Sequence, residues 1–426
     1  MKKLTLFLFI LISFLCKTNN LYAQNWSLER SVQMYAEINE SPPSITLHWE
    51  SQPVYGFTLY RRLKGASSWG SPLAELNGDV NTYIDNDVSI GISYEYKIVK
   101  DAAISGFGSI NAGIKLPMVD YRGGLILLVD QTHADELSFE LERLRTDLEG
   151  DGWVVARIDL SPDDEVTAVK QAIVSKINFD TIAYNAIFLL GHIPVPYSGN
   201  LFPDGHTNHE GAWPADLYYG ELNSNWTDIS VNNSISLDDR NHNIPADGKF
   251  DQSVIPSDIE LPVGRVDFAN MPAFTETETE LLRKYLDKHH AFRHKHFTST
   301  RRMLTENNFG GLPEGFAQSA YRNGAAMFGP DEVYTIDYDS LKTGSYLWSF
   351  GAGGGTFTSA NGITTTEQLA QDSLQTVFAM MFGSYFGDWD ADNNLLRATL
   401  ASGTVLSNVW AGRPKYQFEH MALGEN

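Results

Sequence analysis

The chain has 426 residues, of which 42% are hydrophobic and 20% are charged. This composition is typical of a folded protein with buried cores, and the length predicts two or three domains of about 100–200 residues each. Asp and Glu number 53 against 31 Lys and Arg, so the formal net charge is −22. A charge of this sign repels phosphate backbones and anionic lipids, which argues against nucleic acid and membrane surfaces as partners.

Residues 1–23 predict a signal peptide. Two lysines precede an apolar run over residues 4–15, and the small residue Ala23 ends the segment. Because the run is too short to cross a bilayer core of about 30 Å, we expect export without membrane insertion, to the cell surface or the medium. The one cysteine, Cys16, lies in this segment, so the mature chain has no thiol for disulfides, metal binding or nucleophilic attack.

Residues 24–118 are predicted to fold as a β-sandwich. Apolar and polar residues alternate along residues 45–49, 57–61 and 94–99, with turn residues between these segments. An alternation of period two is typical of half-buried antiparallel strands. We therefore expect antiparallel strands, each burying one face, throughout this region.

This N-terminal region resembles a fibronectin type III domain. The resemblance rests on Trp49 in an early strand, on Tyr60 in a later one, and on the corner formed by Gly91, Tyr94 and Tyr96. Another sandwich topology is the alternative. Modules of either kind usually act as spacers or binding units.

After residue 119 the pattern changes to strands that alternate with helices. Residues 124–130 form an apolar run that ends at Asp130, which is typical of a strand buried on both faces. Residues 135–149 place leucines at three- and four-residue steps, as an amphipathic helix does. Further strands are expected over 153–160 and 185–190, with a helix over 163–177. This order predicts a first α/β unit with a parallel sheet over residues 119–275.

A second α/β unit is predicted over residues 276–426, beginning with a long helix over 276–296. Strands are expected over 302–305, 332–336, 346–350, 377–382 and 404–410, and helices over 313–323 and 393–401. Residues 191–270 are rich in Gly, Pro, Asn and Asp, and a loop region of this length is usually functional or stiffened by a metal. The chain ends without a linker or an anchoring segment, so we expect this unit to be truncated and the natural protein to continue.

From about residue 123 onward the chain resembles the secreted gingipain-like peptidases of the caspase-like clan. The resemblance includes the paired α/β units, the stretch Asp216-Leu217-Tyr218-Tyr219, and Leu261-Pro262-Val263-Gly264-Arg265 at the entry to the second unit. It implies a caspase-like fold and a cysteine peptidase with a histidine base after one strand and a cysteine nucleophile after the next.

The two functional groups of that family are missing from this chain. The base position falls on Ala352, and the nucleophile position falls on Ser384 or Tyr385. A serine needs a base within hydrogen-bond reach, and the candidates close to it in sequence are Asp388 and Asp390. The sequence therefore predicts a degenerate peptidase homologue that binds a protein, a peptide or a surface glycan. The alternative is an active hydrolase or peptidase that uses Ser384 or a metal held by a histidine loop.

A calcium site is predicted in the long loop region. Oxygen-bearing side chains occur at Asp239, Asn241 and Asn243 and again around a glycine turn at Asp247 and Asp251. Calcium takes six to eight oxygen ligands, and exported proteins meet high calcium concentrations. The insertion at residues 244–246 departs from the twelve-residue calcium loop.

A second group of alternating acidic residues precedes the last predicted helix. Asp388, Asp390 and Asp392 could hold another metal ion. The alternative role for this stretch is capping of the helix by Asp392 or Asn393.

Two pairs of histidines have metal-like spacing. His206 and His209 lie in a loop without the helical spacing of a metalloprotease motif, so zinc is not expected there. His290 and His294 lie one turn apart near the end of the long helix, where cations favour the helix dipole. We interpret this second pair as part of a solvated helix face.

Overall fold

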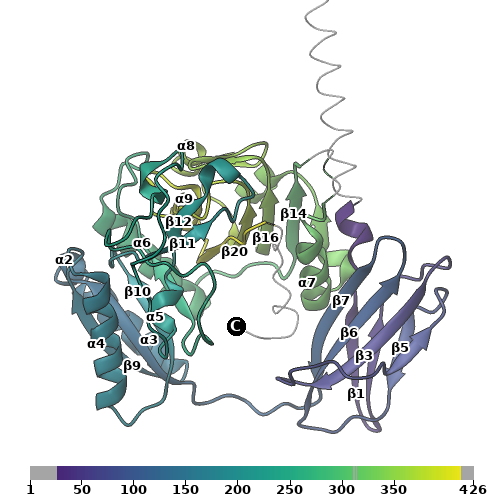
Figure 1. The fold of residues 1–426 in the computed structure, drawn as a ribbon. Coiled ribbons are helices and arrows are strands. Elements are labelled where there is room, and N and C mark those ends of the chain that lie inside the picture. The colour runs from purple at the N-terminus through teal and green to yellow at the C-terminus, as the bar shows by residue number, and fades with distance from the viewer. Residues whose placement is uncertain (1–25, 310–311, 313, 414–426) are drawn as a thin grey trace, which may run out of the picture.

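The structure, a computed structural model, describes residues 26–309, 312 and 314–413. The predicted signal peptide, with Cys16, lies outside the described residues, as do Pro313 and the last thirteen residues of the chain. Figure 1 shows two antiparallel sheets at the N-terminal side and two parallel sheets with their helices beside them. Within the described ranges, no helix has both the length and the apolar character that crossing a bilayer requires.

The N-terminal region consists of two antiparallel sheets around one apolar cluster. Trp49, Phe57 and Tyr96 are among the buried residues of this cluster. The three-stranded sheet has the order β1 (Tyr35–Glu40), β2 (Pro43–His48), β5 (Thr82–Asp85). The four-stranded sheet has the order β4 (Ala74–Leu76), β3 (Gly56–Leu63), β6 (Ser93–Asp101), β7 (Gly106–Gly113).

The N-terminal region is docked on helix α7 (Gln318–Phe328) of the second α/β unit. The Ser31 hydroxyl donates to the Gln318 carbonyl at 3.0 Å, and the Arg322 guanidinium lies 3.8 Å from the centre of the Phe107 ring. Residues far apart in sequence thus pack against one another on the side where Figure 1 places α7 beside β7.

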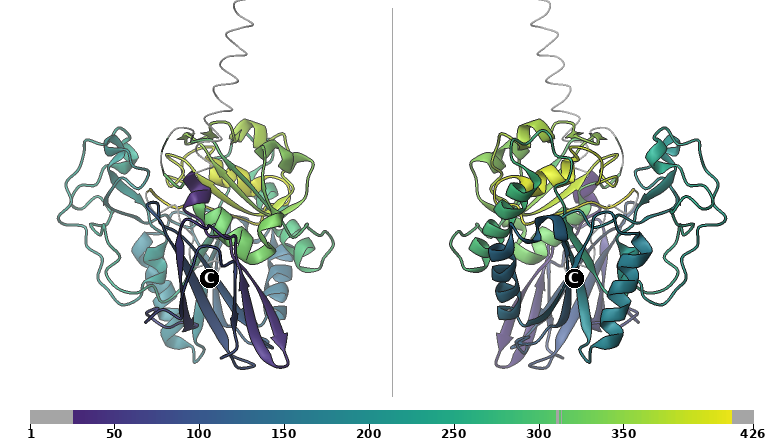
Figure 2. Two further views of the ribbon diagram at one scale, coloured as in Figure 1. Left: turned by 90° about the vertical axis from the view of Figure 1, so that its right-hand side faces the viewer. Right: turned by 90° about the vertical axis from the view of Figure 1, so that its left-hand side faces the viewer.

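The first parallel sheet is covered by helices on both faces. Alternate residues of β8 point to opposite sides: Leu125 and Leu127 pack with α3 (Ser138–Gly150), whereas Ile126 and Leu128 pack with α4 (Val166–Phe179). Figure 2 shows these two helices on either side of the strands. The sheet order is β13 (Val263–Val266), β10 (Tyr184–Leu190), β8 (Gly123–Asp130), β9 (Trp153–Leu160), and a short helix α2 (Gln131–Ala134) follows β8.

The second parallel sheet shares an apolar cluster with the first. Helix α6 (Glu278–Arg293) begins at a capping box of Thr277 and Glu280, and its buried face contributes Leu282 and Tyr285 to the cluster that reaches both sheets. The sheet order is β15 (Val333–Thr335), β14 (Met303–Asn307), β16 (Tyr346–Ala352), β20 (Thr376–Phe382), β21 (Ser407–Val409). The same unit also contains helices α8 (Thr366–Leu369) and α9 (Leu395–Ala401). It contains a small sheet of three short strands as well: β17 (Gly355–Thr356), β18 (Ser359–Ala360) and β19 (Thr364–Thr365).

Two predicted boundaries differ from the structure. Residues 261–265 do not open the second unit, because Val263–Val266 pairs in parallel with β10 and forms the edge strand β13 of the first sheet. The helix predicted over 313–323 begins at Gln318 and runs to Phe328, where Gly329 follows with φ of +87° and ends it.

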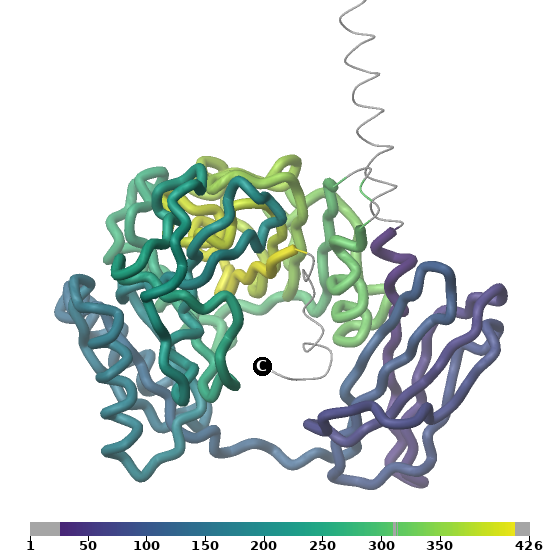
Figure 3. Tube along the Cα trace, viewed as in Figure 1, coloured from purple at the N-terminus to yellow at the C-terminus, as the bar shows by residue number. Residues whose placement is uncertain are grey.

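The long loop region crosses from the first unit to the second. It contains β11 (Tyr197–Leu201), β12 (Gly211–Pro214) and α5 (Leu217–Gly220). Figure 3 traces this teal segment alongside the yellow C-terminal part of the chain. Its side chains bond to residues that follow β20, as described below, so it covers the carboxyl ends of the second sheet, where ligands bind in folds of this kind.

Candidate functional site

A serine and a histidine meet where two loops come together. Ser384 lies just after β20, and His206 lies in the loop after β11. His206 Nε2 is 2.7 Å from Ser384 Oγ, and both side chains are half-buried. A hydroxyl at hydrogen-bond distance from an imidazole has the geometry of a nucleophile with its general base.

The carboxylate of Asp204 fixes both loops. Asp204 is 3% exposed and accepts from the backbone N–H of His206 at 3.2 Å and from the backbone N–H of Tyr385 at 3.3 Å. Its second oxygen also bonds to His209 Nδ1 at 2.8 Å. One buried carboxylate therefore fixes the backbone of His206 relative to the backbone of Tyr385, the residue after the serine.

Tyr385, directly after the serine, has a backbone conformation that is rare for a residue with a side chain. Its φ is +67°, in the left-handed region. Its ring stacks on His206, with 5.7 Å between the ring centres and 11° between the planes. Strained backbone of this kind costs about 1–3 kcal/mol and persists where the surroundings hold it, often at functional sites.

His209, in the same loop as His206, lies between two carboxylates. It is 2% exposed, and its Nε2 lies 2.8 Å from Asp388 Oδ2 while its Nδ1 bonds to Asp204. Burial lowers the pKa of His209, but hydrogen bonds to Asp204 and Asp388 outweigh it and raise that pKa to about 9. His209 is therefore an imidazolium at neutral pH and ties the two loops together.

The acidic residues near Ser384 in sequence do not serve as its base. Asp388 is fully buried and bonds to His209 and to the Asn241 amide at 3.0 Å. Asp390 pairs with Arg240 and accepts from the Tyr197 hydroxyl at 2.5 Å. Both aspartates thus anchor the long loop region.

Asp392 and Asn393 do not cap the last helix. The N-cap of α9 is Asn394, whose side chain accepts from the Leu396 backbone N–H at 2.9 Å. Asn393 has φ of +54°, and its side-chain oxygen accepts from the Ala273 backbone instead. The predicted cap was wrong because this turn places the capping side chain later in the chain than the sequence pattern suggested.

The predicted calcium ligands are engaged separately. Asp251 accepts from the Thr227 hydroxyl and from three backbone N–H groups of residues 229–231, and these bonds outweigh burial to lower its pKa. Asp247 accepts from the backbone of Ile244 and Lys249, whereas Asp239 is solvent-exposed. Among the described residues, these three aspartates do not form a cluster of three ligand atoms.

The two asparagines of the same stretch are fully buried. Asn241 donates to the Ala212 carbonyl and Asn243 donates to the carbonyls of Gly199 and Phe250. Their side-chain oxygens have no hydrogen-bond partner within the described part of the chain. These amides hold the loop region against β11 and β12.

Ala352 offers no chemistry at the site. It is the last residue of β16, fully buried, and packs in an apolar cluster with Phe350 and Phe382. The glycine turn that follows passes close to Ser384, because a Cβ on Gly355 would lie 2.3 Å from the Ser384 carbonyl oxygen. The turn therefore brings backbone, rather than a side chain, up to the serine.

A cavity of about 480 Å³ lies beside the two loops. Pro203 and Trp213 line it from the loop that carries the histidines, and Gly387 lines it from the loop that carries the serine. Trp410 also lines the cavity and donates its indole N–H to the Gly383 carbonyl at 2.9 Å. Arg265 and Asp267, near the end of β13, also line the cavity, and Arg265 forms a bidentate pair with Asp216 at 2.7 and 2.8 Å.

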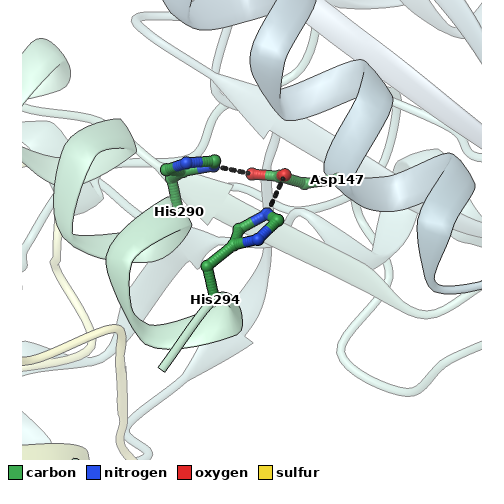
Figure 4. Close-up of side chains that lie close together, drawn as sticks. All are labelled: Asp147, His290 and His294. Carbon is green, nitrogen blue, oxygen red and sulfur yellow. Dashed lines mark hydrogen bonds and ion pairs between the residues drawn. The ribbon is translucent and has the colours of Figure 1, made fainter. Parts of the chain in front are cut away.

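His290 and His294 do not simply face solvent. Both bond to Asp147 of α3, at 2.8 Å from His290 Nδ1 and 2.9 Å from His294 Nε2, as Figure 4 shows. The three residues join α6 to α3. The interpretation as a solvated helix face is right for the exposed His294 but wrong for the half-buried His290, and it missed the bonds of both to Asp147, a buried residue that a sequence pattern does not pair with the histidines.

Reasoning from the sequence missed the pairing of His206 with Ser384 and the role of Asp204. The serine and the histidine are separated by 178 positions, and a lone aspartate in a loop carries no signal. Both residues of the pair were candidates, but for different sites.

Comparisons with known proteins identify no matching family model and no matching curated protein. Among solved structures, the Arg-specific cysteine proteinase gingipain R (RgpB) is 12% identical with a TM-score of 0.40, over 68% of this chain and 64% of its own. The pro- and mature domains of Porphyromonas gingivalis RgpB are 12% identical with a TM-score of 0.42, over 67% and 63%. Pectate lyase PelI from Erwinia chrysanthemi is 16% identical with a TM-score of 0.17, over 24% and 33%. The chain covers less than two thirds of each of these neighbours.

Proposed function

We propose that this protein is a serine-dependent hydrolase in which Ser384 is the nucleophile and His206 is the general base. The observation that carries the proposal is the 2.7 Å distance between His206 Nε2 and Ser384 Oγ. The buried Asp204 supports it, because its bonds to the backbone of His206 and Tyr385 hold the pair in place. Pre-positioned groups of this kind are what acyl transfer requires.

The chemistry begins with the proton of the Ser384 hydroxyl. His206 Nε2 takes this proton while Oγ attacks the acyl carbon of the substrate and forms a C–O bond. The tetrahedral intermediate then expels its leaving group, which receives the proton from His206. Water attacks the acyl-enzyme, again with His206 as base, and the serine is regenerated.

Neither Ser384 nor His206 lines the cavity, but Gly387, three residues after the serine, does, and the cavity supports a substrate with an apolar or aromatic portion. Its walls include four tryptophans, and Trp213 and Trp410 lie parallel with 6.0 Å between their ring centres. Aromatic rings of this kind bury large areas of a ligand without losing much side-chain freedom. The acyl compound that we propose is therefore a peptide or an ester with a bulky apolar group next to the bond that is cleaved.

Hydrolysis assays with the whole exported chain test the proposal. The wild-type protein is incubated with a diverse peptide library and with aromatic acyl esters, beside a Ser384→Ala variant. We expect turnover that the substitution reduces by at least about 10³-fold, since the nucleophile is removed. Equal product in both proteins, or product in neither, would contradict the proposal.

The second candidate is a binding protein without catalytic activity. Two observations favour it: Ala352 supplies no base, and no acidic group among the described residues bonds to His206 Nδ1. On this alternative, the tryptophan-lined cavity would bind a protein, a peptide or a surface glycan without cleaving it. Binding of intact peptide with the same affinity by wild type and Ser384→Ala, without turnover, would favour this candidate.

The wider setting of the protein is part of the same proposal. We infer export by the signal peptide, action in the medium or at the cell surface, a fibronectin type III-like β-sandwich over residues 24–118, and a gingipain-like α/β region after it. Calcium at the loop of residues 239–251 is supported by the buried side-chain oxygens of Asn241 and Asn243, which have no partner among the described residues. It requires that Asp247 or Asp251 exchange backbone bonds for the ion.

A further inference from the structure

A group of three metal-ligating side chains lies away from the serine and histidine pair, at the carboxyl edge of the first sheet. Asp130 is the last residue of β8, His133 lies in α2 and Glu278 is the first residue of α6. One ligand atom from each of them lies within 4.8 Å of the other two. We propose that Asp130, His133 and Glu278 bind a Zn²⁺ ion, and that this ion ties the start of α6 to the first sheet.

The distances between the ligand atoms are longer than hydrogen bonds and close to the spacing of ligands around a metal ion. His133 Nε2 lies 3.7 Å from Asp130 Oδ2 and 3.5 Å from Glu278 Oε1. Nitrogen–oxygen hydrogen bonds are about 2.7–3.2 Å long, so neither separation is bonded in this way. Zinc with bonds of about 2.0–2.2 Å in a tetrahedral arrangement places its ligands roughly 3.3–3.6 Å apart.

The second Asp–His cluster shows the contrast. In Figure 4, Asp147 bonds directly to His290 and His294, at 2.8 and 2.9 Å. Protons account for both of these contacts. The cluster at Asp130 lacks such bonds, and Glu278 Oε1 is a buried oxygen with no hydrogen-bond partner in the described ranges. Burying a carboxylate oxygen without a hydrogen bond is costly, and a cation bound to it would reduce that cost.

Neighbouring groups hold the ligands in the orientation that zinc requires. His133 Nδ1 lies 2.8 Å from the Thr279 hydroxyl, and donation from Nδ1 leaves the lone pair of Nε2 directed at the two carboxylates. The backbone N–H and hydroxyl of Thr132 bond to Asp130 Oδ1 at 2.9 and 2.6 Å, and the backbone N–H of His192 bonds to Oδ2 at 3.2 Å, so the carboxylate is fixed beside His133. Outer partners of this kind are typical of metal-binding histidines and carboxylates.

Charge and access also fit a divalent cation. In the described part of the chain, no Lys or Arg forms an ion pair with Asp130 or Glu278, and Arg397 and His192 interact with the charge of Glu278 only from a longer distance. A cavity of about 340 Å³ has Glu278, Glu276 and Asp392 in its lining and so reaches one of the three ligands. Three protein ligands leave a fourth position for water.

Zinc titration of the whole chain tests the proposal. After treatment with a chelator and its removal, calorimetry with Zn²⁺ alone should show one ion bound per wild-type chain and a raised melting temperature. His133→Ala should lose this binding, and Glu278→Gln, which keeps the shape of the side chain, should weaken it by at least about tenfold. Circular dichroism checks that both variants are folded, and a misfolded His133→Ala leaves Glu278→Gln as the deciding variant.

His294→Ala is the matched control, because it removes a histidine from the hydrogen-bonded cluster on the same helix. It should bind zinc as the wild type does, and so should Ser384→Ala, whatever the outcome of the hydrolysis assays. The proposal would be overturned by a wild-type chain that binds no zinc, by unchanged binding in Glu278→Gln, or by binding that His294→Ala abolishes.

Discussion

His206 and His209 lie three residues apart in one loop, yet their surroundings give them opposite roles. His206 is half-buried, and its Nε2 lies at hydrogen-bond distance from the Ser384 hydroxyl, with no carboxylate among the described residues bonded to its ring. His209 is buried between Asp204 and Asp388 and already carries its proton. The placement of carboxylates, rather than the residue type, therefore decides which of the two histidines can act as a base.

The largest effect that the comparison predicts is on activity. His206→Ala should lower kcat/KM by about 10²–10⁴-fold, because the general base is lost while the nucleophile stays. Its melting temperature should change little, since the side chain is half-buried. Steady-state kinetics and a thermal melt measure the two effects, and unaltered kinetics would break the distinction between the histidines.

His209→Ala should act mainly on stability. The substitution leaves the buried carboxylates of Asp204 and Asp388 without their cation, and breaking a buried ion pair costs about 3–5 kcal/mol. Urea denaturation gives the change in the free energy of unfolding. His206→Ala serves as its control, and an equal loss of stability in the two variants would show that the two environments are not distinct.

The pH dependence of stability sharpens the same comparison. The pKa of His209 is about 9 in the folded chain, above its usual value of about 6.5 in unfolded chains. Its contribution to stability is therefore fully present below pH of about 6.5 and is lost as the pH rises through about 9. Urea midpoints measured at pH 7 and pH 10 should fall more for the wild type than for His209→Ala, and parallel curves would refute this assignment.

The smallest expected effect concerns calcium in the loop that carries Asn241 and Asn243. If calcium binds the native chain there, chelation should lower the melting temperature. The free energy of unfolding should fall by about 2.7 kcal/mol when the calcium removed was at one hundred times its dissociation constant. Asp251→Asn is the matched variant for this loop. A melting temperature that does not change with calcium would contradict a calcium site in this loop.

The fold could be predicted further than the site because its signals are local. The strand at 153–160 and the apolar run before Asp130 follow from residue patterns within a few positions. Edge strand β13 has only four residues, so its membership of the first sheet depends on pairing with β10, which no periodicity reveals.

The site depends on contacts between distant segments. His206 meets Ser384 only because the loop region folds over the second sheet, held there by pairs such as Arg240 with Asp390. From the sequence, His206 was considered only as a metal ligand. Ser384 was considered as a nucleophile for which no histidine base was identified. Nothing within several residues of either one indicated the other.

Covalent labelling with a serine-directed sulfonyl fluoride, followed by peptide mass spectrometry, tests whether His206 activates the Ser384 hydroxyl. We expect one adduct on Ser384 in the wild-type chain, none at that position in Ser384→Ala, and labelling at least about 100-fold slower in His206→Ala, because the base activates the hydroxyl. Absence of an adduct on Ser384, or labelling at the same rate in His206→Ala, would contradict the account.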